Sequence, residues 1–288
     1  MKKLNIDWNT DVYCLIGNPI SKSLSPKIHN YIFSLNNKNS VYLAFKVEEN
    51  LKTVIHSFRA LNIKGFNVTI PYKVEIMKYL DGIEEDAKVL GAVNTVKNVN
   101  GKLVGYNTDG TGFIKSLKKE GIKIENKNFI ILGSGGASQA ISKKLAMEGA
   151  KKIVILNRTV EKAITLGKSI KNMFNQVDVY CDSLDNVYKY LETDVVINCT
   201  SIGMYPKESL SPVDSTIFNK NTVICDIIYK PIETKFLRDA KQNNAKTIGG
   251  LSMLINQAIL SQQKWSNSNN EILKYFEKIK GFLCNDVE

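Results

Sequence analysis

The stretch FIILGSGGASQAI, residues 129–141, decides the fold class. Its first part is a short apolar run of strand length, and its last part has the composition of a helix. Between them, Gly133, Gly135 and Gly136 allow a tight turn and let the backbone approach a pyrophosphate, whose charge then lies at a helix N-terminus. Strand, glycine turn and helix in this order predict a dinucleotide-binding βα unit. The alternative is a glycine-rich turn that binds no ligand.

The chain after Lys127 repeats this alternation of strand and helix. Helical patterns over 137–148 and 160–171 separate short, continuous apolar runs. Such runs are typical of a parallel sheet whose two faces are both covered by helices. They are FIILG, KIVIL, VDVY, DVVINC and TVICDI. We therefore predict an α/β fold with a doubly wound, Rossmann-type domain.

The first hundred residues predict a second α/β domain. Strands are expected at VYCLIG, VYLAFKV and GFNVTI, with helices after Pro26, over 50–62 and over 72–90. In AVNTVKNVNGKLVGYN, residues 92–107, the letters VNG lie between two alternating patterns and indicate a hairpin.

The C-terminal segment carries two amphipathic patterns, over 251–264 and 270–283, beside the polar linker SNSNN. Because a chain that begins in one domain often returns to it, we assign this segment to the first domain. The predicted crossover between the domains runs from Thr108 to Gly112. The predicted domains are residues 1–108 with 250–288, and residues 109–249.

Composition and charge exclude several classes of protein. The formal net charge is +11, but nearly all of the 39 basic residues are lysines spread over the whole chain, and no nucleic-acid motif accompanies them. No apolar run approaches the length of a bilayer span, and the N-terminus lacks the apolar core of a secretory signal, so we expect a cytoplasmic protein. Five scattered cysteines and two histidines favour neither disulfides nor a metal site.

Arg158 indicates which dinucleotide is bound. It follows Asn157, which lies 21 positions after Gly136, where NAD-binding folds usually carry an acidic residue for the ribose hydroxyls. A guanidinium instead forms paired hydrogen bonds to a 2′-phosphate, so Arg158 favours NADP(H). Thr159 can add a hydroxyl donor, and Lys162 a second positive charge. The alternative is a solvated arginine at the end of a strand.

Polar residues also follow the strands of the N-terminal half. Lys73 ends NVTIPYK, and similar polar residues beside glycines occur in GAVNT, residues 91–95, and GYNTDG, residues 105–110. Alone, Lys73 would be interpreted as a surface cation, but three such clusters in one domain indicate a crevice at the carboxyl edge of a sheet. Ser23 and Ser25 precede a helix; Ser25 could be an N-cap, or the pair could hold a carboxylate.

Taken together, these stretches resemble the shikimate dehydrogenase family over nearly the whole chain. Nine motifs match in order, and one departure is Lys22, where many members have a histidine. The motifs are GNPISKSLSPKIHN, NVTIPYK, GAVNT, GYNTDG, GSGGAS, NRT, NCTSIGM, DIIYKP and GGLSMLINQA. The resemblance implies reversible, NADPH-dependent reduction of 3-dehydroshikimate to shikimate by a monomer or homodimer.

The resemblance also implies the roles of individual residues. Lys73 and Asp109 would be the catalytic pair. Residues that would line the substrate site beside that pair are Ser23, Ser25, Thr69, Asn94, Tyr229 and Gln257. Residues assigned to the cofactor site are Gly133, Ser134, Gly135, Gly136, Ala137, Asn157, Arg158, Thr159, Lys162, Ile227, Gly250 and Met253. Of these, Ile227 and Met253 could equally be core residues.

Two other functions remain open at this point. A quinate/shikimate dehydrogenase with wider substrate and cofactor choice would be expected to carry an acidic residue in place of NRT, which is absent here. A nucleotide-binding regulator without catalysis would not need Lys73 and Asp109, which are both present.

Overall fold

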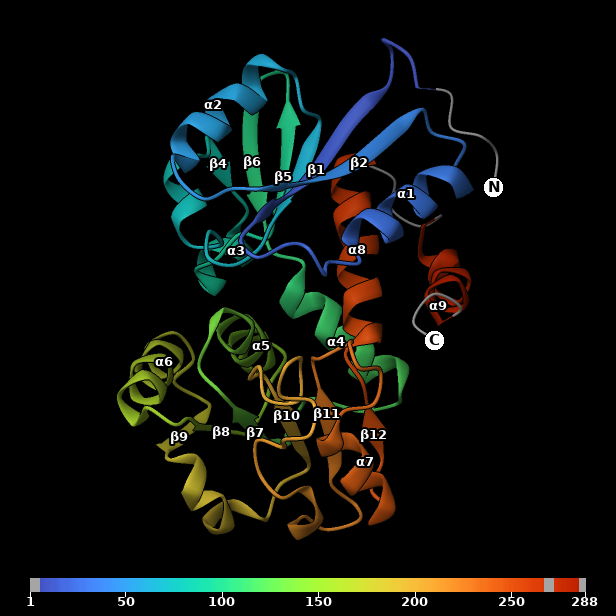
Figure 1. Cartoon of the computed structure of the whole chain (residues 1–288). Coiled ribbons are helices and arrows are strands. Elements are labelled where there is room, and N and C mark those ends of the chain that lie inside the picture. Colours follow the sequence, from blue (N-terminus) through green and yellow to red (C-terminus); the bar gives the residue numbers. More distant parts are fainter. Residues whose placement is uncertain (1–5, 267–271, 285–288) are drawn as a thin grey trace. The chain divides into compact units, whose positions relative to one another are not determined.

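The structure, a computed structural model, describes residues 6–266 and 272–284. It divides the chain into two compact units (Figure 1). The first unit comprises residues 1–108 and 255–288, and the second comprises residues 109–254. Among the described residues, no helix combines the length and the apolar character that a membrane span requires.

The second unit is built on a six-stranded sheet with the order β12-β11-β10-β7-β8-β9. Every neighbouring pair in this sheet is parallel. The strand order reverses between β7 and β10, which is where open α/β sheets bind their ligands. The strands are β7 (Asn128–Leu132), β8 (Lys152–Leu156), β9 (Asp178–Asp182), β10 (Val195–Asn198), β11 (Val223–Asp226) and β12 (Thr247–Ile248).

Helices cover both faces of this sheet, as predicted. Because side chains alternate along a strand, Phe129 and Ile131 enter one apolar core, whereas Ile130 and Leu132 enter another. In Figure 1, α5 and α6 lie on one side of the strands and α7 on the other. The helices of this unit are α4 (Asp109–Lys119), α5 (Gly136–Met147), α6 (Val160–Met173) and α7 (Lys235–Gln242), with short 3-10 turns over Leu184–Tyr190 and Ser215–Ile217.

The first unit contains a mixed six-stranded sheet with the order β2-β1-β3-β5-β6-β4. Strand β1 pairs in parallel with β2 and β3, whereas β5 is antiparallel to both β3 and β6. The predicted hairpin is confirmed, with Asn100 and Gly101 at positive φ in its turn. The strands are β1 (Asp11–Gly17), β2 (Ser40–Lys46), β3 (Gly65–Val68), β4 (Gly82–Ile83), β5 (Thr95–Val99) and β6 (Lys102–Tyr106).

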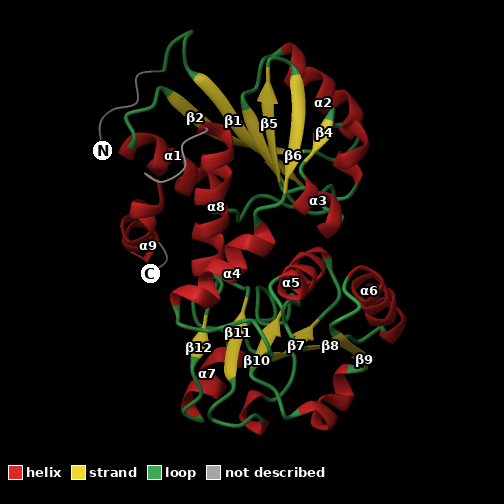
Figure 2. Cartoon of the chain, turned by 180° about the vertical axis from the view of Figure 1, so that it is seen from behind, coloured by secondary structure: helices red, strands yellow, loops and turns green. Residues whose placement is uncertain are grey.

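This sheet also separates two apolar cores. Cys14 and Ile16 of β1 point into one core, and Tyr13 and Leu15 into the other, where they pack with Trp265. Figure 2 shows α1 and α8 on one side of the sheet and α2 and α3 on the other. The helices are α1 (Ser25–Leu35), α2 (Leu51–Ala60), α3 (Glu85–Leu90), α8 (Leu251–Ser266) and α9 (Phe276–Cys284), with 3-10 turns over Glu75–Tyr79 and Ile272–Tyr275.

The structure corrects the prediction of helices over 72–90. Only a 3-10 turn and the short α3 form there, because the segment between them joins the sheet as β4. The Asp81 carboxylate fixes that segment by accepting hydrogen bonds from the Leu103 N–H at 2.6 Å and from Arg59 at 2.5 Å.

Two other elements differ from the sequence interpretation. Helix α4 was not predicted, because Gly110 and Gly112 resemble loop residues. A Cβ atom at Gly110 would lie 2.9 Å from the carbonyl oxygen of Ala140 in α5, so the close packing of two helices requires this glycine. The predicted helix over 270–283 is α-helical only from Phe276, and residues 267–271, which include most of the SNSNN linker, lie outside the described residues.

Candidate functional site

The glycine turn after β7 has the geometry expected of a phosphate-binding loop. Gly133 has φ +103, and a Cβ atom there would lie 3.1 Å from Thr200 and 3.3 Å from the Cys199 carbonyl. Ser138 holds the turn by donating a hydrogen bond from its hydroxyl to the Gly133 carbonyl oxygen at 2.5 Å. The backbone therefore runs close to β10 at the point where the strand order reverses.

The N-terminus of α5 is open. A Cβ atom at Gly135 or Gly136 would meet no atom within 4 Å, and both glycines are exposed. Gly135 is the N-cap residue, no side chain caps the helix, and its first turn contains no acidic residue. The first N–H groups of α5, together with the positive end of the helix dipole, fit a bound phosphate group. Ser134 and Ala137 flank these glycines and are half-buried.

Arg158 follows the next strand, β8, and its guanidinium is exposed. Within the described residues, the side chains of Arg158 and of the exposed Lys162 form neither a hydrogen bond nor an ion pair. Thr159 is the N-cap residue of α6, but its hydroxyl does not cap the helix. Asn157 donates a hydrogen bond to the Thr159 carbonyl oxygen at 2.8 Å and so fixes the turn. Two cations and a hydroxyl are thus available to an anionic ligand.

The acidic residue on the adjacent strand does not neutralise this positive charge. The Asp182 carboxylate accepts hydrogen bonds from Asn186 at 2.6 Å, from the Ser183 N–H at 2.8 Å and from the Tyr190 hydroxyl at 3.1 Å. These bonds, led by that from Asn186, lower the pKa of Asp182 to about 2. Asp182 therefore remains ionised and engaged within its own loop.

A buried carboxylate joins the loops after β10 and β11. Asp226 accepts hydrogen bonds from the Asn198 amide at 3.1 Å, the Thr234 hydroxyl at 2.8 Å and the Ile228 N–H at 2.9 Å. Burial raises the pKa of Asp226 to about 6, against the opposing effect of these bonds. The network fixes the backbone on both sides of Ile227.

The residues around Ile227 are tightly packed. Gly250 donates its N–H to the Ile228 carbonyl oxygen at 3.1 Å, and a Cβ atom at Gly250 would lie 2.2 Å from the Ile227 oxygen. Ile227 and Met253 pack against the core of the second unit, as the core interpretation of these residues expects. Tyr229 follows, and burial raises the pKa of its hydroxyl.

Four of the predicted substrate residues of the first unit lie in the segments that follow β1 and β3: Ser23, Ser25, Thr69 and Lys73. Thr69 donates its N–H to the Ile16 carbonyl oxygen at 2.9 Å, and the Lys73 carbonyl oxygen accepts the Val93 N–H at 2.8 Å, so neighbouring strand ends hold both residues. Lys73 is half-buried. Ser25 is the first residue of α1 and not its N-cap, which is Leu24. The Ser23 hydroxyl accepts the Ser25 N–H at 3.2 Å.

Asn94 belongs to a buried polar cluster that the sequence interpretation missed. Its carboxamide bonds to Thr108, and hydroxyl contacts extend from there to Ser261 on α8. Ser261 lies one helical turn after Gln257 and donates to its carbonyl oxygen, so the cluster connects Asn94 to the helical turn that carries Gln257. No local signal marks this cluster in the sequence, because Thr95 stands beside Asn94 and Ser261 beside Gln262 as ordinary polar residues.

The structure places the two predicted catalytic residues in different units. Lys73 belongs to the first unit and Asp109 to the second, where it begins α4 and is 8% exposed. The glycine turn and Arg158 follow the adjacent parallel strands β7 and β8 and therefore share one edge of the sheet.

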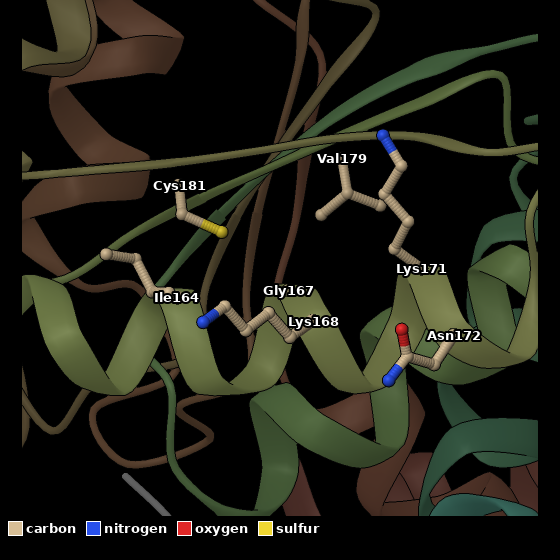
Figure 3. A pocket seen from close by; sticks show the side chains of 7 residues that line it. All are labelled: Ile164, Gly167, Lys168, Lys171, Asn172, Val179 and Cys181. Carbon is tan, nitrogen blue, oxygen red and sulfur yellow. The ribbon is translucent and has the colours of Figure 1, made fainter.

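A pocket of about 260 Å³ lies elsewhere on the second unit, between α6 and β9 (Figure 3). Lys168, Lys171 and Cys181 are among its lining residues, and none of the predicted site residues lines it. A Cβ atom at Gly167 would lie 2.3 Å from the Cys181 sulfur, so the helix approaches the strand closely here. The pocket is separate from the glycine turn and Arg158.

Comparison with known proteins assigns families to both parts of the chain. Residues 15–96 match the shikimate dehydrogenase substrate binding domain, and residues 115–236 match the shikimate/quinate 5-dehydrogenase domain. The NADP(+)-dependent shikimate dehydrogenase of Caldanaerobacter subterraneus subsp. tengcongensis is 46% identical over 279 residues, which cover 96% of this chain and 99% of that protein.

Solved structures give the same result. A shikimate dehydrogenase in complex with NADP+ superposes with a TM-score of 0.91 at 42% identity, covering 99% of this chain and 98% of the other. The shikimate 5-dehydrogenase of Thermus thermophilus, in complex with NADP(H) and shikimate, has a TM-score of 0.83 at 30% identity, with coverage of 94% and 98%. The chain belongs to the shikimate dehydrogenase family.

Proposed function

We propose that this protein catalyses the reversible, NADP(H)-dependent reduction of 3-dehydroshikimate to shikimate, a step of aromatic amino acid biosynthesis. The observation that carries the proposal is the match over nearly the full length of the chain to enzymes with this name. The presence of both Lys73 and Asp109 supports an active enzyme over a silent regulator. NADP(H), when bound, donates or accepts the hydride.

The two units have different roles. The second unit binds the cofactor: the N–H groups of the glycine turn receive the pyrophosphate, and Arg158, Thr159 and Lys162 receive the 2′-phosphate. Two observations support this assignment: these three residues are exposed, and the cationic side chains of Arg158 and Lys162 have no partner within the described residues. The fixed segment around Ile227, together with Gly250 and Met253, borders the nicotinamide.

The first unit supplies most of the substrate site. Ser23 and Ser25 hold the carboxylate, while Thr69, Asn94 and Gln257 bind ring hydroxyls, joined by Tyr229 of the second unit. Hydroxyl and amide groups suit a ligand rich in hydroxyls, because each can both donate and accept hydrogen bonds.

Lys73 acts on the reacting oxygen. As the carbonyl of the substrate becomes an alkoxide, the Lys73 ammonium supplies a proton and stabilises the developing negative charge. Asp109 orients the neighbouring hydroxyl and balances the charge of Lys73. In the reverse direction, Lys73 accepts the proton from the hydroxyl that is being oxidised.

One absorbance assay tests the proposal. Purified protein is mixed with shikimate or quinate and with NADP+ or NAD+, and formation of reduced cofactor is followed. We expect rapid turnover with shikimate and NADP+. Faster turnover of quinate, or a preference for NAD+, would instead support a quinate/shikimate dehydrogenase. No turnover with any pair would overturn the proposal.

A further inference from the structure

Ser261 is the centre of a buried set of hydroxyl groups in the first unit. Its Oγ lies 2.8 Å from Thr95 Oγ1, 3.2 Å from Thr108 Oγ1 and 3.1 Å from the Asn67 amide nitrogen. The side chain of Ser261 is fully buried, and both threonines are at most 2% exposed. Because buried polar groups are expensive to leave unpaired, each partner here constrains the others.

The donors and acceptors of this set have a fixed direction. The Ser261 hydroxyl lies 2.9 Å from the Gln257 carbonyl oxygen, which can only accept, so the Ser261 proton is directed there. The Ser261 oxygen then has two lone pairs for acceptance. The Asn67 amide has acceptors of its own, the Asn94 carbonyl oxygen at 3.1 Å and Thr95 Oγ1 at 3.0 Å, so the Ser261 oxygen accepts from the hydroxyls of Thr108 and Thr95. Thr108, whose proton points toward Ser261, accepts a hydrogen bond from Asn94 Nδ2 at 2.9 Å.

Thr108 fixes the orientation of the Asn94 carboxamide at two atoms. Its backbone N–H, which can only donate, lies 2.8 Å from Asn94 Oδ1, and its hydroxyl receives Asn94 Nδ2. A flipped carboxamide would place an NH₂ group against this N–H group. The chain of bonds from Asn94 through Thr108 and Ser261 to Gln257 therefore determines which way the amide donates.

We propose that Thr108 and Ser261 are positioning residues for the substrate: they orient the Asn94 carboxamide and connect it to the helical turn that carries Gln257. This inference rests on the proposed function, in which Asn94 and Gln257 bind hydroxyl groups of shikimate. It assigns a role to two residues that do not themselves touch the substrate. Their side chains connect β5 and the segment that follows β6 to α8.

The test uses variants that differ by single groups. Thr108→Val replaces the hydroxyl with a methyl group of similar size, whereas Thr108→Ser retains the hydroxyl. Ser261→Ala removes the central oxygen. Ser142→Ala is the matched control, because Ser142 is equally buried and donates to the carbonyl oxygen four residues earlier, at 2.6 Å, but takes no part in this set.

We expect Thr108→Val and Ser261→Ala to raise the KM for shikimate about five- to tenfold, the effect of one lost hydrogen bond at a buried amide. The KM for NADP+ should change by less than about twofold, since the affected bonds belong to the first unit. Thr108→Ser should restore most of the shikimate affinity, and Ser142→Ala should alter neither KM, even where its melting temperature falls.

An unchanged KM for shikimate in Thr108→Val would overturn the inference, whatever happens to its melting temperature. If that variant does not fold, an unchanged KM in Ser261→Ala has the same meaning. Equal defects in Thr108→Ser and Thr108→Val would also overturn it, because the hydroxyl would then not be responsible. Wild-type protein that fails to oxidise shikimate would instead refute the proposed function, which separates the two failures.

Discussion

Replacing Arg158 with alanine should convert an NADP-selective enzyme into a poorly selective one. The guanidinium is exposed and has no hydrogen bond or ion pair within the described residues, so its removal takes no interaction from the fold. The melting temperature should therefore stay unchanged. The whole effect should appear in the binding of the cofactor that carries a 2′-phosphate.

The size of the effect follows from the contact that is lost. A charge-assisted, paired hydrogen bond between a guanidinium and a phosphate contributes about 1.5–3 kcal/mol, which corresponds to roughly ten- to hundredfold in affinity. Lys162 remains in the variant and retains part of the attraction. We therefore expect the KM for NADP+ to rise about tenfold or more, while the KM for NAD+ changes by less than about twofold.

The assay measures the initial rate of shikimate oxidation while the concentration of each cofactor is varied. Arg238→Ala is the matched control, because Arg238 is another exposed arginine of the second unit without a partner in the described residues, on α7. It should leave both KM values unchanged. Equal losses with NADP+ and NAD+ in Arg158→Ala would show that Arg158 supports the fold and does not recognise the phosphate.

Three further predictions concern catalysis, packing and pH. Lys73→Ala should lower kcat about a hundred- to ten-thousandfold without unfolding the protein, and Lys73→Arg should not restore kcat, as measured by shikimate turnover. Adding Asp109→Asn to Lys73→Ala should lower kcat little further, because the two residues act as a unit. Gly250→Ala should destabilise the protein by about 1–3 kcal/mol in thermal melts, because its Cβ atom would lie 2.2 Å from a carbonyl oxygen. Gly281→Ala is the control and should not destabilise it, because a Cβ atom there meets no atom within 4 Å. Burial lowers the pKa of His29 from 6.5 to about 3, so the unfolded chain binds the proton first as pH decreases. The free energy of unfolding should therefore fall by about 1.4 kcal/mol per pH unit between these two values. His29→Gln should flatten this slope in denaturant titrations.

The fold of the second unit could be predicted because its signals are local. Apolar runs such as residues 129–132 and 153–156, separated by helical patterns, already specify a sheet buried on both faces. Element β4 could not be predicted, because its two residues become a strand only through pairing with β6. Helix α4 was missed for a related reason: Gly110 is required by a neighbouring helix that lies about 30 residues further along the chain.

The site was predicted where a single segment carries the chemistry. The glycine turn and Arg158 stand out in the sequence because their roles depend on backbone geometry and charge at strand ends. The buried hydroxyl cluster could not be predicted, because Thr95 and Ser261 are 166 positions apart and each alone is an ordinary polar residue. Only the folded chain shows that they meet beside Asn94.

We propose that this chain oxidises shikimate with NADP+ and that Lys73 transfers the proton. The most direct measurement is the rate of NADPH formation from shikimate and NADP+ by the wild-type protein and by folded Lys73→Ala, under identical conditions. We expect rapid turnover by the wild type and a loss of about a hundredfold or more in the variant. Near-normal turnover by folded Lys73→Ala, or no turnover by the wild type, would contradict it.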